Sequence, residues 1–260
     1  MKYLTDDLIY SLDPVKFAEL VGFSELDEWQ REALRYKGDR MLLCCSRQAG
    51  KSTVTAIRAL HQVLFAPGSL VLLVSPSQRQ SSELFKKVTG LIRSLPIQPD
   101  LIEDNRLSVH LSNQSRIVSL PSSEQTVRGY SGAALIVLDE ASRIPDSLFY
   151  SLTPMVATSG GTMILLSTPA GKRGFFHEAY QSDEWHKYTI TAEDVPRIPA
   201  DFLERERKQI GDFYFRQEYE CEFMEPEGSL FTLDQIEGCV SDEVEAWNFT
   251  FKGVSFNETN

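Results

Sequence analysis

Short runs of apolar residues recur along the chain, separated by longer stretches in which apolar positions return at helical spacing. A run without polar positions is typical of a strand that is buried on both faces of a parallel sheet. The runs predict core strands at residues 39–45, 69–75, 134–139, 162–167 and 186–191, and a hairpin at 106–111 and 115–120. The stretches between and after them predict helices at residues 51–65, 78–94, 146–156, 200–209 and 212–221. This alternation indicates an α/β fold with a mostly parallel sheet flanked by helices.

The same pattern divides the chain into three segments. Residues 1–38 form a helical lead-in, in which we expect Ser24 to cap a helix. Residues 39–225 hold all the predicted core strands. The turn Pro226-Glu227-Gly228 marks the start of a linker or tail, residues 226–260.

The first predicted strand leads into a phosphate-binding loop, or P-loop. Its nucleotide-binding residues are Ser46, Arg47, Gln48, Ala49, Gly50, Lys51, Ser52 and Thr53. Backbone N–H groups at the start of the following helix attract polyphosphate. Gly50 lets the backbone approach the phosphates, Lys51 reaches the β- and γ-phosphates, and the Ser52 hydroxyl holds Mg²⁺. Cys45 stands where the motif G-x-x-x-x-G-K-[ST] has its first glycine, and the alternative is a strand–loop–helix corner with a surface lysine.

Two carboxylates follow the apolar run at residues 134–138. Ligands of open α/β sheets bind at the carboxyl ends of the strands, so both acids fall at the expected edge. We expect Asp139 to hold Mg²⁺ and Glu140 to polarise the attacking water. An exposed acidic turn is the alternative interpretation.

Small hydroxyl residues end another predicted strand, at Ser167-Thr168. Such residues can sense the γ-phosphate and pass its loss to a neighbouring segment, and Thr168 is therefore a candidate nucleotide-binding residue. An ordinary strand–turn boundary punctuated by Pro169 and Gly171 is the alternative.

Together these motifs resemble the large terminase subunit of tailed bacteriophages, the ATPase that pumps DNA into the capsid. Ser46–Ser52, with Arg-Gln inside and no leading glycine, looks like the family's variant P-loop. Leu138–Ala141 resembles its acidic strand motif and Leu166–Pro169 its coupling motif. Residues 215–223 resemble the end of the ATPase region, so the resemblance covers most of the chain.

The resemblance implies a P-loop NTPase of the ASCE (RecA-like) class that hydrolyses ATP with Mg²⁺, with Lys51, Glu140 and Arg128 as catalytic residues. Gln30 is similar to the family's adenine-contacting glutamine, whose amide offers a donor and an acceptor. Arg128 matches the arginine that completes a neighbouring subunit's active site. Arg47 and Arg143 stay open as alternatives, since either could reach the γ-phosphate.

The resemblance also implies partners: double-stranded DNA, the portal protein, the small terminase subunit, and other copies of the chain in a ring. We expect a monomer in isolation and a location in the host cytoplasm. The formal net charge of −11 argues against a strong DNA grip, because nucleic-acid binders usually present a basic face. The isolated chain is therefore expected to bind DNA weakly.

Other features narrow the class of protein. The four cysteines form no C-x-x-C pair, which favours buried reduced thiols, and no apolar run predicts a signal peptide or a membrane span. The segment after Gly228 is too short for the nuclease domain that usually follows, so we expect no DNA cleavage. A helicase-like DNA-remodelling ATPase and a nucleotide-gated docking module without catalysis are the competing functions.

Overall fold

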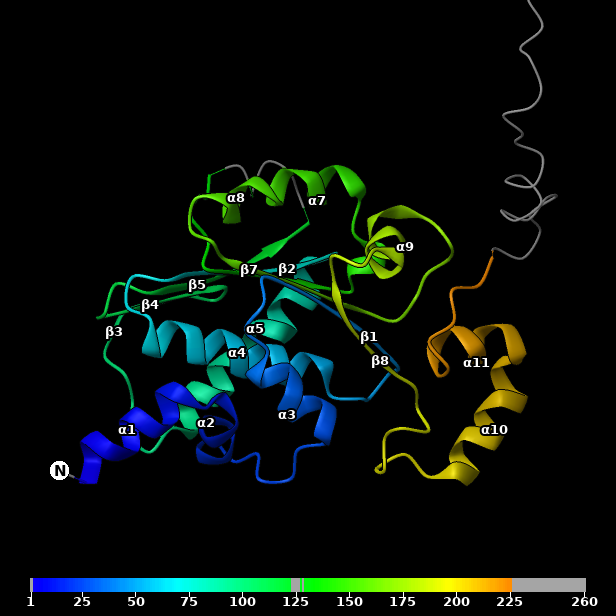
Figure 1. Ribbon diagram of the computed structural model, residues 1–260, viewed down its shortest axis with the longest axis horizontal. Helices are drawn as coiled ribbons and strands as arrows, with labels where there is room; N and C mark the ends of the chain where they lie inside the picture. Colours follow the sequence, from blue (N-terminus) through cyan, green and yellow to red (C-terminus); the bar gives the residue numbers. More distant parts are fainter. Residues whose placement is uncertain (1, 123–126, 128, 226–260) are drawn as a thin grey trace, which may run out of the picture. The chain divides into compact units, whose positions relative to one another are not determined.

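The computed structural model describes residues 2–122, 127 and 129–225. An eight-stranded sheet with the order β3-β4-β5-β2-β6-β7-β1-β8 lies at its centre (Figure 1). The strands are β1 Arg40–Cys45, β2 Leu70–Ser75, β3 Leu101–Asp104, β4 Ser108–Leu111, β5 Arg116–Pro121, β6 Leu135–Asp139, β7 Thr162–Ser167 and β8 His186–Ile190. Neighbours from β5 to β8 in this order are parallel, whereas β3, β4 and β5 pair antiparallel. The predicted mostly parallel sheet is confirmed.

Helices cover both faces of the sheet (Figure 1). One face carries α1 Lys2–Leu12, α2 Pro14–Leu20, α3 Glu28–Arg35, α4 Lys51–Phe65 and α5 Gln78–Ser94. The other carries the 3₁₀ helix η1 Ala141–Arg143, α7 Asp146–Leu152, α8 Pro154–Ala157 and α9 Gly174–Gln181. After β8 come α10 Ala200–Ile210 and α11 Asp212–Glu218, which form a small apolar cluster of their own with Ala192.

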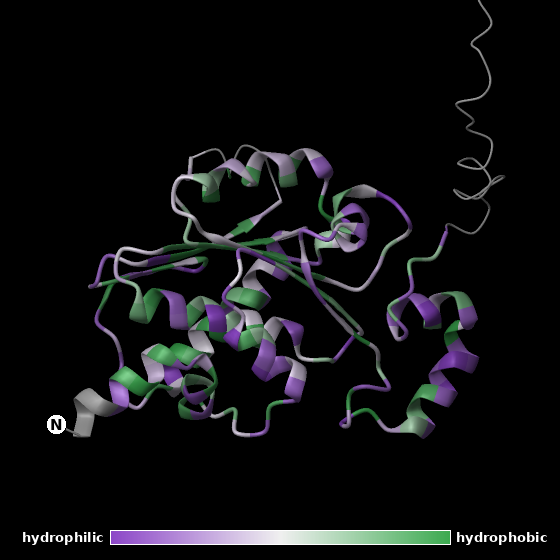
Figure 2. Ribbon diagram, viewed as in Figure 1, coloured by the Kyte–Doolittle hydropathy of each residue, from purple (hydrophilic) through white to green (hydrophobic). Residues whose placement is uncertain are grey.

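The central strands are apolar throughout because successive side chains enter two different cores. In β1, Met41 and Leu43 face the core under α4, while Leu42 and Cys44 face the core under α9. In Figure 2 the ribbon along the middle of the sheet is green, because these strands consist of hydrophobic residues. Leu42 and Leu43 are fully buried, and burial of one such side chain contributes about 1.5–3 kcal/mol.

Two helix predictions need correction. The helix expected to be capped by Ser24 begins at Glu28, and Asp27 is its N-cap. The cap is fixed there because the Asp27 N–H donates to Gln30 Oε1 at 3.0 Å, while both Asp27 carboxylate oxygens pair with Arg197 at 2.8 Å. The single helix expected at residues 146–156 is broken at Pro154, which has no N–H to continue the first helix.

Two elements were not predicted from the sequence. β3 has four exposed residues and no apolar run, so its pairing with β4 depends on backbone hydrogen bonds. α9 begins at Gly174, whose φ of 78° is readily adopted by glycine. The Asp146 carboxylate caps α9 by accepting the Phe175 N–H at 2.9 Å, a contact between residues 29 apart.

The N-terminal helices belong to the main core. Phe17, Trp29 and Leu34 are buried in the same cluster as the apolar face of α4. The first of two compact units ends at Met224, and the second begins at Glu225. Within the described residues, none of the helices is both long and apolar enough to cross a membrane. The predicted thiols Cys44, Cys45 and Cys221 are free and buried, and Cys239 lies outside the described residues.

Candidate active site

The P-loop connects β1 to α4 through two residues with left-handed backbones. Gly50 is the N-cap of α4 with a φ of 94°, and Gln48 has a φ of 64°, which is uncommon for a residue with a side chain. Lys51 opens α4 and its ammonium group donates to the Cys45 carbonyl at 3.4 Å. Cys45 is the last residue of β1 and its side chain is buried, so this position does not need the usual glycine.

Gln30 on α3 lies against the P-loop. Its Nε2 donates to the Ala49 carbonyl at 3.3 Å, while its Oε1 accepts the Asp27 N–H. A Cβ on Gly50 would come within 2.5 Å of that Nε2, so the Gln30 amide would have to shift, and the φ of 94° independently favours glycine there. The adenine contact of Gln30 stays a prediction. The structure shows a different contact of Gln30, with the P-loop.

Asp139 ends β6 and is nine-tenths buried. Burial, and then the charge of Glu140, raise the pKa of Asp139 to about 6, although Lys51 acts in the opposite direction. Its Oδ1 accepts the Glu140 N–H at 3.1 Å, and no ion pair joins it to a Lys or Arg in the described part of the chain. A buried carboxylate without a paired cation fits a divalent metal ion, and Asp139 and the Ser52 hydroxyl remain the predicted oxygen ligands.

A second buried oxygen supports this fit. The Ser75 hydroxyl at the end of β2 is fully buried and has no hydrogen-bond partner among the residues that the structure describes. β2 pairs with β6 so that Val74 stands opposite Leu138, and Ser75 and Asp139 are therefore the next positions at the same edge of the sheet. Ser75 was not predicted, although it is a hydroxyl residue that ends the core strand predicted at residues 69–75.

A cavity of about 580 Å³ opens at this edge. It is lined by Arg47, Gln48, Gly50, Lys51, Ser52, Thr53, Gln80, Lys87, Glu140 and Arg143. Ser46 and Ala49 are buried instead and do not line it. Gln80 and Lys87 of α5 were not predicted, although their spacing of two helical turns places them on one face of that helix.

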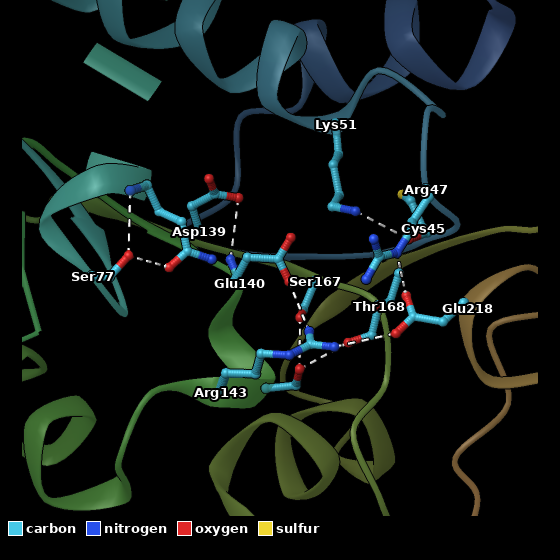
Figure 3. Close-up of polar contacts among 12 residues, drawn as sticks. Cys45, Arg47, Lys51, Ser77, Asp139, Glu140, Arg143, Ser167, Thr168 and Glu218 are labelled. Atoms are coloured by element: carbon cyan, nitrogen blue, oxygen red, sulfur yellow. Dashed lines mark hydrogen bonds and ion pairs between the residues drawn. The ribbon is translucent and has the colours of Figure 1, made fainter. Parts of the chain in front are cut away.

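Both candidate arginines of the described part meet Glu218 at the end of α11 (Figure 3). Arg47 Nε lies 2.8 Å from Glu218 Oε2, and Arg143 Nη2 lies 3.2 Å from Glu218 Oε1. Arg143 also pairs with Glu140, at 2.8 Å. Burial by itself raises the pKa of Glu218, but the hydrogen bond from Arg47 and the charges of both arginines hold that pKa below its ordinary value. Glu218 lies in the segment 215–223 that resembles the end of the family's ATPase region, but it was not predicted as a site residue.

Thr168 lies next to these residues, at the end of β7 (Figure 3). It is buried, and its hydroxyl donates to the Glu218 carboxylate. Its carbonyl accepts the Ser142 hydroxyl at 2.9 Å, and that hydroxyl also meets Ser167 at 2.7 Å. Thr168 is therefore joined to the site through Glu218, and its role toward nucleotide stays a prediction. Arg128 lies outside the described residues.

Comparisons with known proteins show the family to which this chain belongs. The model of the T4likevirus-type large terminase subunit, N-terminal region, matches residues 42–237. The large terminase subunit of Thermus virus P23-45 is 27% identical over 260 aligned residues, which cover 85% of this chain and 53% of the relative. The chain thus spans about half the length of the curated relatives it matches.

Solved structures share the fold. The large terminase ATPase domain of Thermus phage P74-26 superposes with a TM-score of 0.70 at 23% identity, covering 80% of this chain and 98% of that domain. The large terminase of bacteriophage D6E in complex with ATP-gamma-S gives a TM-score of 0.60 at 14% identity, covering 76% of this chain and 52% of that one. The fold is that of a P-loop NTPase, and the chain belongs to the family of T4likevirus-type large terminase subunits, of which it represents the N-terminal region.

Proposed function

We propose that this chain binds ATP with Mg²⁺ and hydrolyses it. The observation that carries the proposal is the convergence of Lys51 and Glu140, from opposite parts of the sequence, on one cavity at the N-terminus of α4. The first N–H groups of a helix have no acceptor within the helix, so they are available to phosphate oxygens. The D6E terminase bound to ATP-gamma-S supports the choice of nucleotide.

Each residue of the site has a separate task in this proposal. Lys51 neutralises the β- and γ-phosphates, and Ser52 and Asp139 hold the metal ion, which supplies further positive charge at the phosphates. Glu140 accepts the proton of the attacking water. Glu140 is paired with Arg143, so that pairing has to loosen before the carboxylate can take the proton.

Beyond hydrolysis, we propose that the chain drives translocation of viral double-stranded DNA into a procapsid in the host cytoplasm. Membership of the large terminase family supports this role. The proposed partners are DNA, the portal protein, the small terminase subunit and further copies of this chain in a ring. The net charge of −11 supports weak DNA binding by the isolated chain.

Substitution of Glu140 by Gln tests the catalytic assignment. The amide cannot accept a proton, so turnover should fall by at least ~10²-fold while Mg·ATP still binds. The measurement is phosphate release, with and without DNA, beside a titration of the non-hydrolysed analogue ATP-gamma-S. Glu83→Gln is the matched control, because Glu83 is an exposed acid of α5 that pairs with Lys86.

Lys51→Ala complements this test, because it should abolish binding of the analogue in a chain that melts cooperatively. If Glu140→Gln turns over at the unmodified rate, another residue accepts the proton of the attacking water. Unchanged affinity in folded Lys51→Ala would remove the P-loop assignment itself.

A further inference from the structure

Among the described residues of the site, Glu218 gathers several polar contacts on one carboxylate. Its two carboxylate oxygens receive Arg47 at 2.8 Å and Arg143 at 3.2 Å, and the Thr168 hydroxyl donates to the same carboxylate (Figure 3). Its side chain is only 12% exposed. The contacts come from the P-loop, from η1 after β6 and from the end of β7, so one carboxylate touches three motif segments.

This arrangement uses the chemistry by which arginines recognise phosphate. A guanidinium group presents its N–H donors as a planar fork that suits carboxylate and phosphate oxygens alike. Arg47 and Arg143 both line the proposed nucleotide cavity. The Glu218 oxygens therefore accept hydrogen bonds from guanidinium groups that a γ-phosphate would also attract.

The charges in this cluster balance one another. Arg47 and Arg143 face the carboxylates of Glu140 and Glu218. If either arginine turns to a γ-phosphate, the buried Glu218 charge loses a donor, and a buried charge without its partner is costly. Arginine contact with a triphosphate is thus opposed by the ion pairs of Glu218, whereas a diphosphate, which lacks the γ-phosphate, leaves these pairs undisturbed.

We propose, on the basis of the ATPase function above, that Glu218 is a positioning residue that holds Arg47 and Arg143 at α11 and sets the preference of the site for triphosphate over diphosphate. The backbone also joins the two segments, because the Arg47 N–H donates to the Glu218 carbonyl at 3.3 Å. That bond does not need the carboxylate, so α11 can stay in place when the side chain is changed.

The variant Glu218→Gln tests the proposal, because an amide oxygen holds guanidinium groups less strongly than a carboxylate does. The released arginines should strengthen the binding of ATP-gamma-S about tenfold and leave ADP binding within about twofold, so the ratio of the two dissociation constants should change about fivefold or more. The measurement is a calorimetric titration of the full chain with each nucleotide in the presence of Mg²⁺, after a thermal melt has shown that the variant is folded.

Glu222→Gln is the matched control, since Glu222 lies four residues further on and pairs with Arg216 instead. The ratio of the ATP-gamma-S and ADP dissociation constants of this variant should equal that of the unmodified chain. Glu218→Asp is a second variant for the case in which the amide unfolds the protein. Its shorter carboxylate cannot reach both guanidinium groups equally, and the ratio should shift about threefold in the same direction.

An unchanged ratio in a folded Glu218 variant would overturn the proposal, as would an equal loss of affinity for both nucleotides, which a purely structural role predicts. If the unmodified chain binds neither nucleotide, the ATPase function fails instead. The two failures are therefore distinguishable.

Discussion

Asp139 is unfavourable for the fold, although it has a proposed role in the site. It ends a buried strand, where its carboxylate has the Glu140 N–H as a donor and the Glu140 carboxylate as a repulsive neighbour. Burial and that repulsion raise its pKa to about 6. Because the folded pKa is above that of the unfolded chain, the protonated form stabilises the fold at acidic pH. This stability is present below about pH 4 and is lost as the pH rises through about 6.

Asp139→Asn should therefore raise the free energy of unfolding of the nucleotide-free chain at pH 7, by about 1–3 kcal/mol, because the amide has no charge to bury. The same variant should lose Mg²⁺-dependent nucleotide binding. Urea unfolding at pH 7 measures the first effect, with Asp183→Asn, an exposed acid, as control. An Asp139→Asn chain that is less stable than the unmodified one at pH 7 would contradict the assignment of a destabilising buried charge.

At the scale of elements, α3 works as a support for the P-loop. Arg58 of α4 donates to the Leu34 and Tyr36 carbonyls at the carboxyl end of α3, at 2.9 and 2.8 Å. At the other end, Gln30 joins the N-cap residue Asp27 to the Ala49 carbonyl of the loop. α3 is thus held at both ends against the strand–loop–helix unit that contains the P-loop.

Gln30→Ala should remove both contacts and destabilise the chain by about 1–3 kcal/mol, the usual cost of leaving buried polar groups unpaired. The binding of ATP-gamma-S and of the guanine analogue GTP-gamma-S should both weaken, because the loop loses its support. If Gln30 also reads adenine, the preference for the adenine nucleotide should fall as well. Titration with both analogues separates the two roles.

Gln30→Glu is the informative control, since its carboxylate keeps an acceptor for the Asp27 N–H but has no donor for Ala49. An equal loss for both nucleotides in Gln30→Ala would leave only the supporting role. Unchanged affinity for both nucleotides would exclude the supporting and the adenine-reading role together.

At the scale of the whole molecule, the described residues supply Arg47 and Arg143 at the cavity, and both are engaged by carboxylates of the same chain. Arg128 lies outside the described residues, and its role in a neighbouring subunit rests on the resemblance of the sequence. Coulomb attraction to a γ-phosphate is strong only at a separation of a few ångströms. An arginine supplied by a neighbour would therefore act only in the assembled ring.

Turnover per chain should then rise more than linearly with protein concentration. Mixing Arg128→Ala with Glu140→Gln should restore phosphate release that neither variant shows alone, because some subunit junctions pair an intact Arg128 with an intact Glu140. The unmodified chain at the same concentrations is the control for assembly. A mixture that stays inactive while the unmodified chain turns over would assign the transition-state charge to Arg47 or Arg143.

The sequence by itself determined the elements whose cause is local. The apolar runs predicted β1, β2, β6 and β7 because a strand buried on both faces is apolar along most of its length. Gly50-Lys51-Ser52 and Asp139-Glu140 predicted the candidate catalytic edge because they stand at or soon after the ends of such strands. The broken helix at Pro154 was also encoded locally and was missed only because its apolar pattern continues across the proline.

Only the tertiary structure decided which distant groups meet at that edge. Glu218 lies 171 residues from Arg47, and Gln30 and Ala49 are 19 residues apart on different elements. Nothing in the local pattern around Glu218 distinguishes it from the acids nearby, because its role depends on where the chain after β8 returns α11 to the P-loop. Periodicity encodes which face of an element is buried, whereas the partner of a polar side chain is set by the packing of whole elements against one another.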